Sequence, residues 1–432
     1  MYNSVDPDPR DAGTCYVAGT LYKGGDFRPY IYKTDDYGAT WRKITNGIPD
    51  DHFTRVVRVD PNKEGLLYAG TETGMYISYD DGQSWHSFQL NLPIVPITDL
   101  TIKDNNLIVA TQGRSIWMID DLTVIHQVLE EQSDFDYGLY APMDSYRYGG
   151  GQSANAKGVG QNHPSGVMTH FYLSQYEEGQ DTVSLSYADP SGEVIKTYST
   201  HADDKDLKLS DLKSGGNMFN WDMKYDDATD FEGMIMWWGS MAGAKAAPGS
   251  YNVTLTVNGQ EMSEDFTILG DPRLGLTDAD YQSQFSFINE INSAVSESHE
   301  AIIEIREVND QVKKYKDIIA DDEEITQLIG EIDSTLQSVE TGLYQTKNRS
   351  RQDPLNFPIR LTNKLAHLNS LAQIGDYPPT DQAIEVKDVL MKEIDALLEV
   401  YDKVKSGSIP QLNNLIRQRA LDYIIIGNDE DE

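Results

Sequence analysis

The chain has 432 residues, of which 70 are acidic and 35 basic, so its formal charge at pH 7 is −35. This acidity excludes binding to nucleic acid or to an anionic membrane through a general basic field, and we read it as a device for solubility. A hydrophobic content of 39% supports real cores in about two to four domains. The single Cys15 excludes an intrachain disulfide, and no apolar run approaches the roughly 18 residues of a membrane span.

Residues 1–127 contain an octapeptide that occurs twice, with starts 44 residues apart. Its pattern is Ser/Thr, any residue, Asp, any residue, Gly, any residue, Ser/Thr, Trp. The key positions are Thr34, Asp36, Gly38 and Trp41 in the first copy, and Ser78, Asp80, Gly82 and Trp85 in the second. The hydroxyl and carboxylate can bond the N–H groups of a turn, the glycine supplies a positive φ, and the tryptophan buries its ring. We therefore predict that both octapeptides close hairpins and have structural roles.

Short strands rich in β-branched and aromatic residues recur around the octapeptides, about four to a unit, as in the blades of a β-propeller. The third unit has lost the pattern, because Ile119, Thr123 and His126 stand where Ser/Thr, Gly and Trp are expected. Terminal repeats are commonly atypical, so this unit is predicted to be the last blade. Three blades do not close a ring of roughly four to eight. We therefore expect the chain to be the C-terminal part of a protein whose earlier blades are missing.

A first blade without an upstream neighbour should leave one apolar face open. On this reasoning Val17, Ile31 and Tyr32 are expected to have one exposed side. An open apolar face of this size favours association.

Three further segments follow the repeats. Residues 128–165 are predicted to be a Gly-rich linker, and residues 166–272 are predicted to form a second β domain with Trp221 and Tyr251 in its core. An apolar insertion in that domain contains Trp237 and Trp238, which we expect either to pack on a neighbouring domain or to stack on a ligand.

Hydrophobic residues recur with a helical period over residues 273–427, which predicts a bundle of four long helices and a short fifth at 415–426. The acidic stretch at 321–324 is placed to favour a helix N-terminus. Residues 428–432 are predicted to be an acidic tail.

Together these segments resemble, along essentially the whole chain, one family of large exported bacterial proteins. This family is labelled sortilin-like, or BNR (Asp-box) repeat glycosyl hydrolase. Residues 110–121, ATQGRSIWMIDD, are similar to the last-blade segment of the family, and residues 354–361 are similar to another family segment. Residues 215–222 and 248–255 resemble the Ig-like sandwich of the flagellar hook-capping type. The implied fold is a partial Asp-box propeller of about three blades, an Ig-like β-sandwich and a C-terminal helical bundle.

The resemblance implies a non-catalytic binding or scaffold region of an exported propeller protein, with a glycan or a protein as ligand. The alternative is the C-terminal portion of a sialidase-like or xyloglucanase-like glycoside hydrolase whose catalytic residues lie upstream. The implied location is extracellular, periplasmic or at the cell surface. The implied partners are the missing N-terminal blades and the ligand; nucleic acid and a membrane span are not expected.

The residues themselves give few candidates for chemistry. Arginines that could bind a carboxylate are Arg28, Arg55, Arg58 and Arg114. Carboxylates that could act on a glycosidic bond are Glu64, Glu72, Asp99 and Asp104. Arg114 lies between Gly113 and Ser115 in a blade loop, where it could face a central channel or bond to carbonyls of a neighbouring blade. No catalytic residue, metal site or cofactor is assigned, so Arg114, Trp237 and Trp238 remain the candidates for ligand binding.

Overall fold

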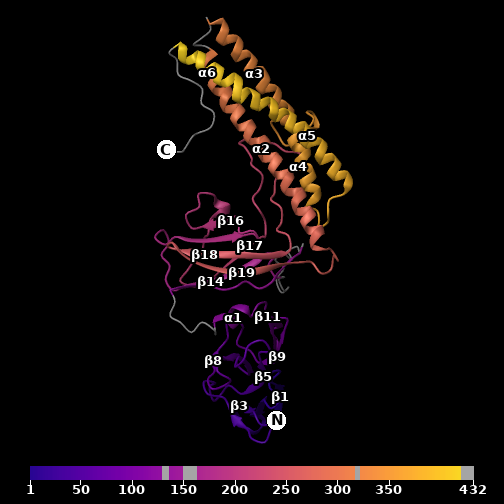
Figure 1. Ribbon diagram of the computed structural model, residues 1–432. Helices are drawn as coiled ribbons and strands as arrows, with labels where there is room; N and C mark the ends of the chain where they lie inside the picture. Colours follow the sequence, from indigo (N-terminus) through magenta and orange to yellow (C-terminus); the bar gives the residue numbers. More distant parts are fainter. Residues whose placement is uncertain (129–135, 149–162, 317–321, 420–432) are drawn as a thin grey trace.

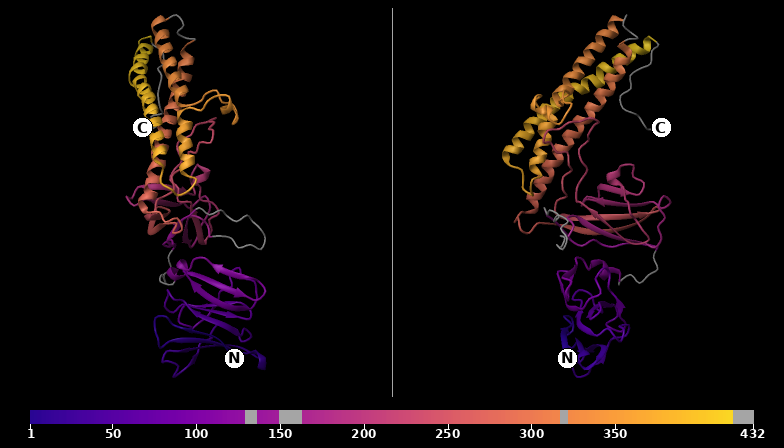
Figure 2. Two further views of the ribbon diagram at one scale, coloured as in Figure 1. Left: turned by 90° about the vertical axis from the view of Figure 1, so that its right-hand side faces the viewer. Right: turned by 180° about the vertical axis from the view of Figure 1, so that it is seen from behind.

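The computed structural model describes residues 1–128, 136–148, 163–316 and 322–419. Three parts follow one another in space as they do along the chain (Figure 1). A stack of three sheets lies at the N-terminal end, two further sheets form the middle, and long helices project away from them (Figure 1). The rotated views show the same order (Figure 2).

The N-terminal part consists of three antiparallel sheets, which we call the first, second and third blades. The first blade contains β1 (Tyr2–Pro7), β2 (Cys15–Leu21), β3 (Asp26–Thr34) and β4 (Arg42–Lys43). The second contains β5 (Thr54–Val59), β6 (Leu67–Thr71), β7 (Met75–Ser78) and β8 (His86–Ser87). The third contains β9 (Ile97–Lys103), β10 (Asn106–Thr111) and β11 (Ile116–Ile119). Each sheet is a simple meander, so strands adjacent in sequence are also paired.

The third blade corrects the expectation of four strands in every unit. Its fourth strand is replaced by α1 (Thr123–Val128). The loss of the hydroxyl, glycine and tryptophan from this unit explains the change. The surviving aspartate, Asp121, instead accepts a hydrogen bond from the Thr123 N–H (2.7 Å) just where the helix begins, and an Asp in this position favours a helix start.

Side chains alternate across each strand, so every blade has two faces. Two separate cores result, one between the first and second blades and one between the second and third. The propeller-like stack is thus held together face to face.

The middle part is a sandwich of two sheets around one core. The smaller sheet has the order β12 (Tyr137–Leu139), β14 (Val167–Leu173), β17 (Gly215–Trp221). The larger has the order β13 (Ser145–Arg147), β19 (Gln260–Gly270), β18 (Gly249–Val257), β15 (Val183–Ala188), β16 (Val194–Ser199). Trp221 is fully buried and Tyr251 is 5% exposed, so both are core residues as predicted.

The boundary predicted for this domain is too late. Strands β12 and β13 lie inside the range predicted to be a linker, and both pair with sandwich strands. A strand of three residues is too short to show the alternation of apolar and polar residues by which strands are recognised in a sequence. The Gly-rich stretch of the predicted linker, residues 149–162, lies outside the described residues.

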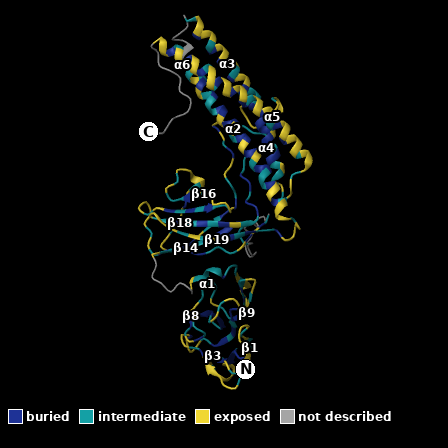
Figure 3. Ribbon diagram, viewed as in Figure 1, coloured by how far each residue is buried: buried dark blue, intermediate teal, exposed yellow. Residues whose placement is uncertain are grey.

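The helices are α2 (Asp278–Lys316), α3 (Glu323–Leu343), α4 (Leu361–Ala372), α5 (Asp381–Lys403) and α6 (Ile409–Gln418). The four predicted long helices are confirmed, and their apolar stripes meet in one core, drawn dark blue inside the bundle in Figure 3. The fifth helix begins earlier than predicted. The Asp322 side chain caps α3 by accepting from the Ile325 N–H (3.2 Å). The predicted acidic tail lies outside the described residues. Among the described helices, none is both long and apolar enough to cross a bilayer.

Candidate functional site

The two octapeptides fold in the same way. In the second copy the Ser78 hydroxyl donates to Asp80 Oδ1 (2.9 Å) and accepts from the Gly82 N–H (2.8 Å). The Asp80 carboxylate also accepts from the N–H and the hydroxyl of Ser84 (2.8 and 2.6 Å). Equivalent bonds of 2.7 to 2.9 Å in the first copy join Thr34, Asp36, Gly38 and Thr40. Both carboxylates are thereby committed to the turn and are unsuited to proton transfer.

The octapeptide turn also accounts for the backbone conformation of its glycines and for the lowered pKa of its aspartates. The glycines at the third key position have φ values of 86° and 81°, in the left-handed region that glycine adopts without strain. Hydrogen bonds from Thr40 hold the pKa of Asp36 below its usual range. Partial burial raises the pKa of Asp80, but bonds from Ser84 and Ser78 outweigh it and the pKa is lowered. Both aspartates are therefore ionised when the turn is formed.

The tryptophan of the second octapeptide joins the first two blades. Trp85 is 2% exposed and packs in the core between them. Its Nε1–H donates to the carbonyl oxygen of Ile44 in the first blade (2.9 Å). An octapeptide therefore buries its tryptophan against the blade that precedes it.

The second blade contacts the first through an apolar face, and the first blade has an equivalent face on its own outer side. In the second blade Val57 pairs with Ala69, which pairs with Tyr76, and all three are buried in the contact. The register gives their counterparts on the first blade as Val5, Val17 and Tyr32. Apolar residues thus recur at matching positions, but no described blade covers them.

This open face forms a hollow of about 720 Å³, lined by Val5, Cys15, Val17, Tyr32 and Trp41 among others. We call it the open face of the first blade. Val5 is 62% exposed and Trp41 is 46% exposed, whereas their counterparts in the second blade are buried. The prediction that Trp41 buries its ring is therefore wrong, because no described blade packs against this face.

The residues named for this open face were also partly wrong. Ile31 is fully buried, because it alternates to the other side of β3 and packs against the second blade. Val17 and Tyr32 do line the hollow, but Val17 is 8% exposed and Tyr32 is half-buried. The side chains that extend into solvent are instead those of Val5 and Trp41.

The opposite end of the stack shows the other half of the contact. In the third blade Ile108 pairs with Met118 and Ala110 pairs with Ile116. These residues lie on the side of the sheet away from the second blade. Ile116 is 72% exposed and Met118 is 54% exposed. Adjacent blades meet through the same kind of apolar contact. The first blade exposes one side of this contact at one end of the stack, and the third blade exposes the other side at the opposite end.

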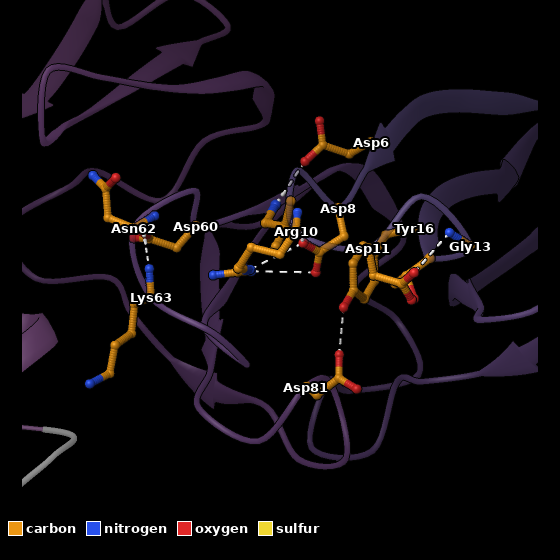
Figure 4. Close-up of polar contacts among 12 residues, drawn as sticks. Asp6, Asp8, Arg10, Asp11, Gly13, Tyr16, Asp60, Asn62, Lys63 and Asp81 are labelled. Carbon is orange, nitrogen blue, oxygen red and sulfur yellow. Dashed lines mark hydrogen bonds and ion pairs between the residues drawn. The ribbon is translucent and has the colours of Figure 1, made fainter.

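Polar groups also tie the first blade to the second (Figure 4). Asp81, inside the second octapeptide, accepts from the Tyr16 hydroxyl (2.5 Å) and pairs with Lys33 and with Arg42, the latter at 3.3 Å. Burial, and then the Asp81 carboxylate, raise the pKa of Tyr16, which keeps the phenol protonated as a donor. In the first octapeptide the position of Asp81 is taken by Tyr37, which is 83% exposed. The ion pairs of Asp81 therefore belong to the contact between the first and second blades, and the first octapeptide has no aspartate at the matching position to repeat them.

A second polar group ties the second blade to the third. The fully buried Asp60 accepts from the N–H groups of Asn62 and Lys63 (2.8 and 3.0 Å) and contacts His126 of α1 (2.9 Å). Burial raises the pKa of Asp60, but the bonds from His126 and Asn62 outweigh it and the pKa is lowered. The histidine that replaces the octapeptide tryptophan thus holds the last blade to its neighbour. The signal in the sequence is a Val-Asp-Pro tripeptide, which occurs at residues 5–7 and again at residues 59–61.

The candidate arginines do not converge. Arg28 pairs with Asp26 (2.7 Å), and Arg55 donates to Glu72 (2.6 Å). Arg114 is exposed and donates to the carbonyl of the adjacent Gly113 (2.9 Å). This contact is local to its own loop, whereas the sequence had suggested a bond to carbonyls of a neighbouring blade.

Arg58 has the contact that was expected of Arg114. Its Nε donates to the Leu100 carbonyl of the third blade (2.7 Å), and its Nη2 pairs with Asp99 (2.7 Å). Of the other candidate carboxylates, Asp104 pairs with the neighbouring Lys103 (3.1 Å) and Glu64 is exposed. Within the described ranges, no group of three His, Cys, Asp or Glu side chains could hold a metal ion.

The apolar insertion packs on the helices. Trp237 bonds through its N–H and carbonyl to the side chain of Asn363 on α4 (2.8 and 2.9 Å). Trp238 accepts from the Ser370 hydroxyl (2.6 Å) through its carbonyl, while its ring is 73% exposed. These residues belong to the bundle, and the structure does not bring them together with Arg114.

Comparisons with known proteins give no family. No family model matches the chain, and no curated protein matches it. Several solved structures match parts of it, and three of them share 13% identity each with this chain. They are YCF48 bound to D1 peptide (46% of this chain, 53% of that chain, TM-score 0.22) and the GH74 enzyme of Niastella koreensis (62%, 46%, 0.23). The third is the extracellular domain of BT4673, assigned to a hybrid two-component system, from B. thetaiotaomicron (63%, 37%, 0.21).

The chain spans about half of the first two of these proteins and 37% of the third. Likeness at such TM-scores does not establish a shared fold. The blade architecture rests on the sheet topology of this chain.

Proposed function

We propose that this chain is a non-catalytic binding and scaffold region of an exported BNR (Asp-box) repeat propeller protein. The three blades would be part of a larger ring, and the sandwich would be Ig-like. The matching hydrogen bonds of the two octapeptides support the Asp-box assignment. The ion pairs of Arg28, Arg55 and Arg58 argue against a sialidase-like arginine triad in this chain, because their charges are used within the chain.

The open face of the first blade carries this proposal. The occupant that fits it is a further Asp-box blade, because the covered counterpart in the second blade shows what such a face contacts. The covering blade would present the apolar residues that the first blade presents to the second, such as Tyr16 and Ile31. Since Tyr37 replaces Asp81, this contact would be apolar and hydrogen-bonded rather than ionic.

The ligand of the complete ring would be a glycan or a protein, and the location would be extracellular, periplasmic or at the cell surface. In the alternative, the complete ring is a glycoside hydrolase and the covering blades carry its catalytic carboxylates. The sequence of those blades distinguishes the two, because hydrolysis needs two carboxylates facing each other across a cleft.

Sedimentation velocity of this chain tests the open face. With no other blade present, the exposed face of the third blade in one copy is the best cover for the first blade of another. We expect the sedimentation coefficient to rise with protein concentration. The double variant Val5→Glu, Trp41→Glu should stay monomeric.

The matched control is Val194→Glu, an exposed valine of the sandwich that should leave association unchanged. A wild-type chain that stays monomeric at every concentration, or a double variant that associates equally well, would contradict the proposal.

A further inference from the structure

A basic pocket lies where the sandwich meets the helical bundle. It has a volume of about 480 Å³ and is lined by residues from six separate stretches of the chain. Its cationic residues are Arg147, Lys224, Lys245 and Arg273, and its carboxylates are Asp271 and Asp376. In a chain with twice as many acidic as basic residues, four cations around one hollow need a physical explanation.

Both arginines are already neutralised. Arg147 is 2% exposed and its guanidinium donates to Asp376 Oδ1 (3.0 Å) and to the carbonyls of Lys245 and Ala246 (2.8 and 3.0 Å). Arg273 pairs with the side chain of Asp271 (2.5 Å), which is buried. The two carboxylates of the pocket are therefore both committed, and the arginines fix its walls.

The two lysines are not neutralised. Lys224 and Lys245 face each other across an isolated antiparallel bridge, so their side chains start from directly opposite positions. Like charges at opposite positions of a strand pair are destabilising. Lys245 Nζ donates to the Tyr148 carbonyl (3.3 Å), and neither lysine forms an ion pair with a carboxylate among the described residues.

Burial is the main influence on Lys245, and it lowers the pKa of this side chain. Among the nearby charges, Asp376 and then Asp222 oppose this shift, whereas Arg147 and Lys224 add to it. An anion between the lysines would supply the missing counter-charge.

The mouth of the pocket is apolar. Ile374 is 81% exposed and Tyr377 is 61% exposed, and both belong to the segment between α4 and α5 that lines the pocket. The pocket thus combines mostly charged and polar walls with apolar side chains at its mouth, and its volume suits a small organic molecule that carries a charged group.

We propose that this pocket binds an organic anion, in which a carboxylate, sulfate or phosphate group lies between Lys224 and Lys245. The carbon skeleton of the ligand contacts Ile374 and Tyr377. Arg147 and Arg273 position the walls and add to the positive field. This site is separate from the open face of the first blade and does not depend on it.

Calorimetric titration of the full chain tests the proposal with benzoate, phenyl sulfate and phenyl phosphate, which differ only in the anionic group. We expect at least one of them to bind at one site per chain, and neutral benzamide not to bind. The double variant Lys224→Gln, Lys245→Gln should weaken binding at least tenfold. Lys213→Gln, which changes an exposed lysine of the sandwich, should leave it unchanged.

Two further measurements sharpen the test. The bound aryl anion should protect Lys224 of the wild-type chain from acetylation, a readout that does not depend on any variant folding. Inorganic sulfate should bind more weakly than phenyl sulfate, because it lacks the contact with Ile374 and Tyr377. The proposal is overturned if no aryl anion binds, if the double variant binds equally well, if Lys224 is not protected, or if inorganic sulfate binds as tightly.

Discussion

Replacing Trp85 by Ala should destabilise the blades more than the same change at Trp41, although both residues end an octapeptide. Removing a fully buried tryptophan costs about 3–5 kcal/mol. Trp85 is 2% exposed and also donates a hydrogen bond to Ile44, so we expect a loss near the upper end of that range. Trp41 is 46% exposed, so about half of the area is at stake and we expect about 2 kcal/mol at roughly 25 cal/mol per Å².

Hydrogen exchange followed by mass spectrometry is the suitable assay, because a chain with several domains does not unfold in two states. Exchange reports the free energy of local opening for peptides in β2 and β3 of the first blade and in β6 and β7 of the second blade. The control is Trp238→Ala, whose ring is 73% exposed and should leave these peptides unchanged. Equal destabilisation by the changes at Trp41 and Trp85 would refute the assignment of one covered and one open face.

Three further predictions concern the blades. Asp80→Ala should lower their local stability by about 1–3 kcal/mol, since the N–H and hydroxyl of the turn lose their acceptor, and hydrogen exchange in β7 checks this. The pKa values of both octapeptide aspartates are lowered by folding, so their stabilisation is present above the unfolded pKa of about 3.9 and is lost as the pH falls through the folded value. The protection of blade amides, corrected for the pH dependence of intrinsic exchange, should therefore fall in acid before that of α5, whose N-cap is the non-titrating Thr380. This chain alone should hydrolyse no aryl glycoside, and turnover that Asp99→Ala or Arg114→Ala abolishes would contradict the binding role.

Local chemistry was predictable from the sequence. The octapeptide pattern indicated a hairpin turn, and the apolar stripes of the long helices indicated a bundle. Each of these depends on residues close together in the chain. The replacement of a strand by α1 was not predictable, because the altered residues Ile119, Thr123 and His126 show what is lost and not what forms instead.

Contacts between segments that are far apart along the chain could not be predicted from the sequence. Lys224 and Lys245 lie 21 residues apart, and only the fold brings them to Arg147 and to the segment after α4. The burial of Trp41 likewise depends on whether another blade packs against its ring. A repeated motif predicts the same turn in each copy, but burial is decided by the neighbouring blade.

Labelling of Cys15 tests most directly whether the open face of the first blade receives another blade. This single thiol lines the hollow beside Val17, and burial raises its pKa, so labelling is best measured at mildly alkaline pH. We predict that Cys15 is labelled in the dilute chain, and that it becomes protected when the chain associates or when further Asp-box blades are supplied. Equal labelling in the dilute and the associated state would contradict the account, as would a thiol that stays unreactive in the dilute monomer.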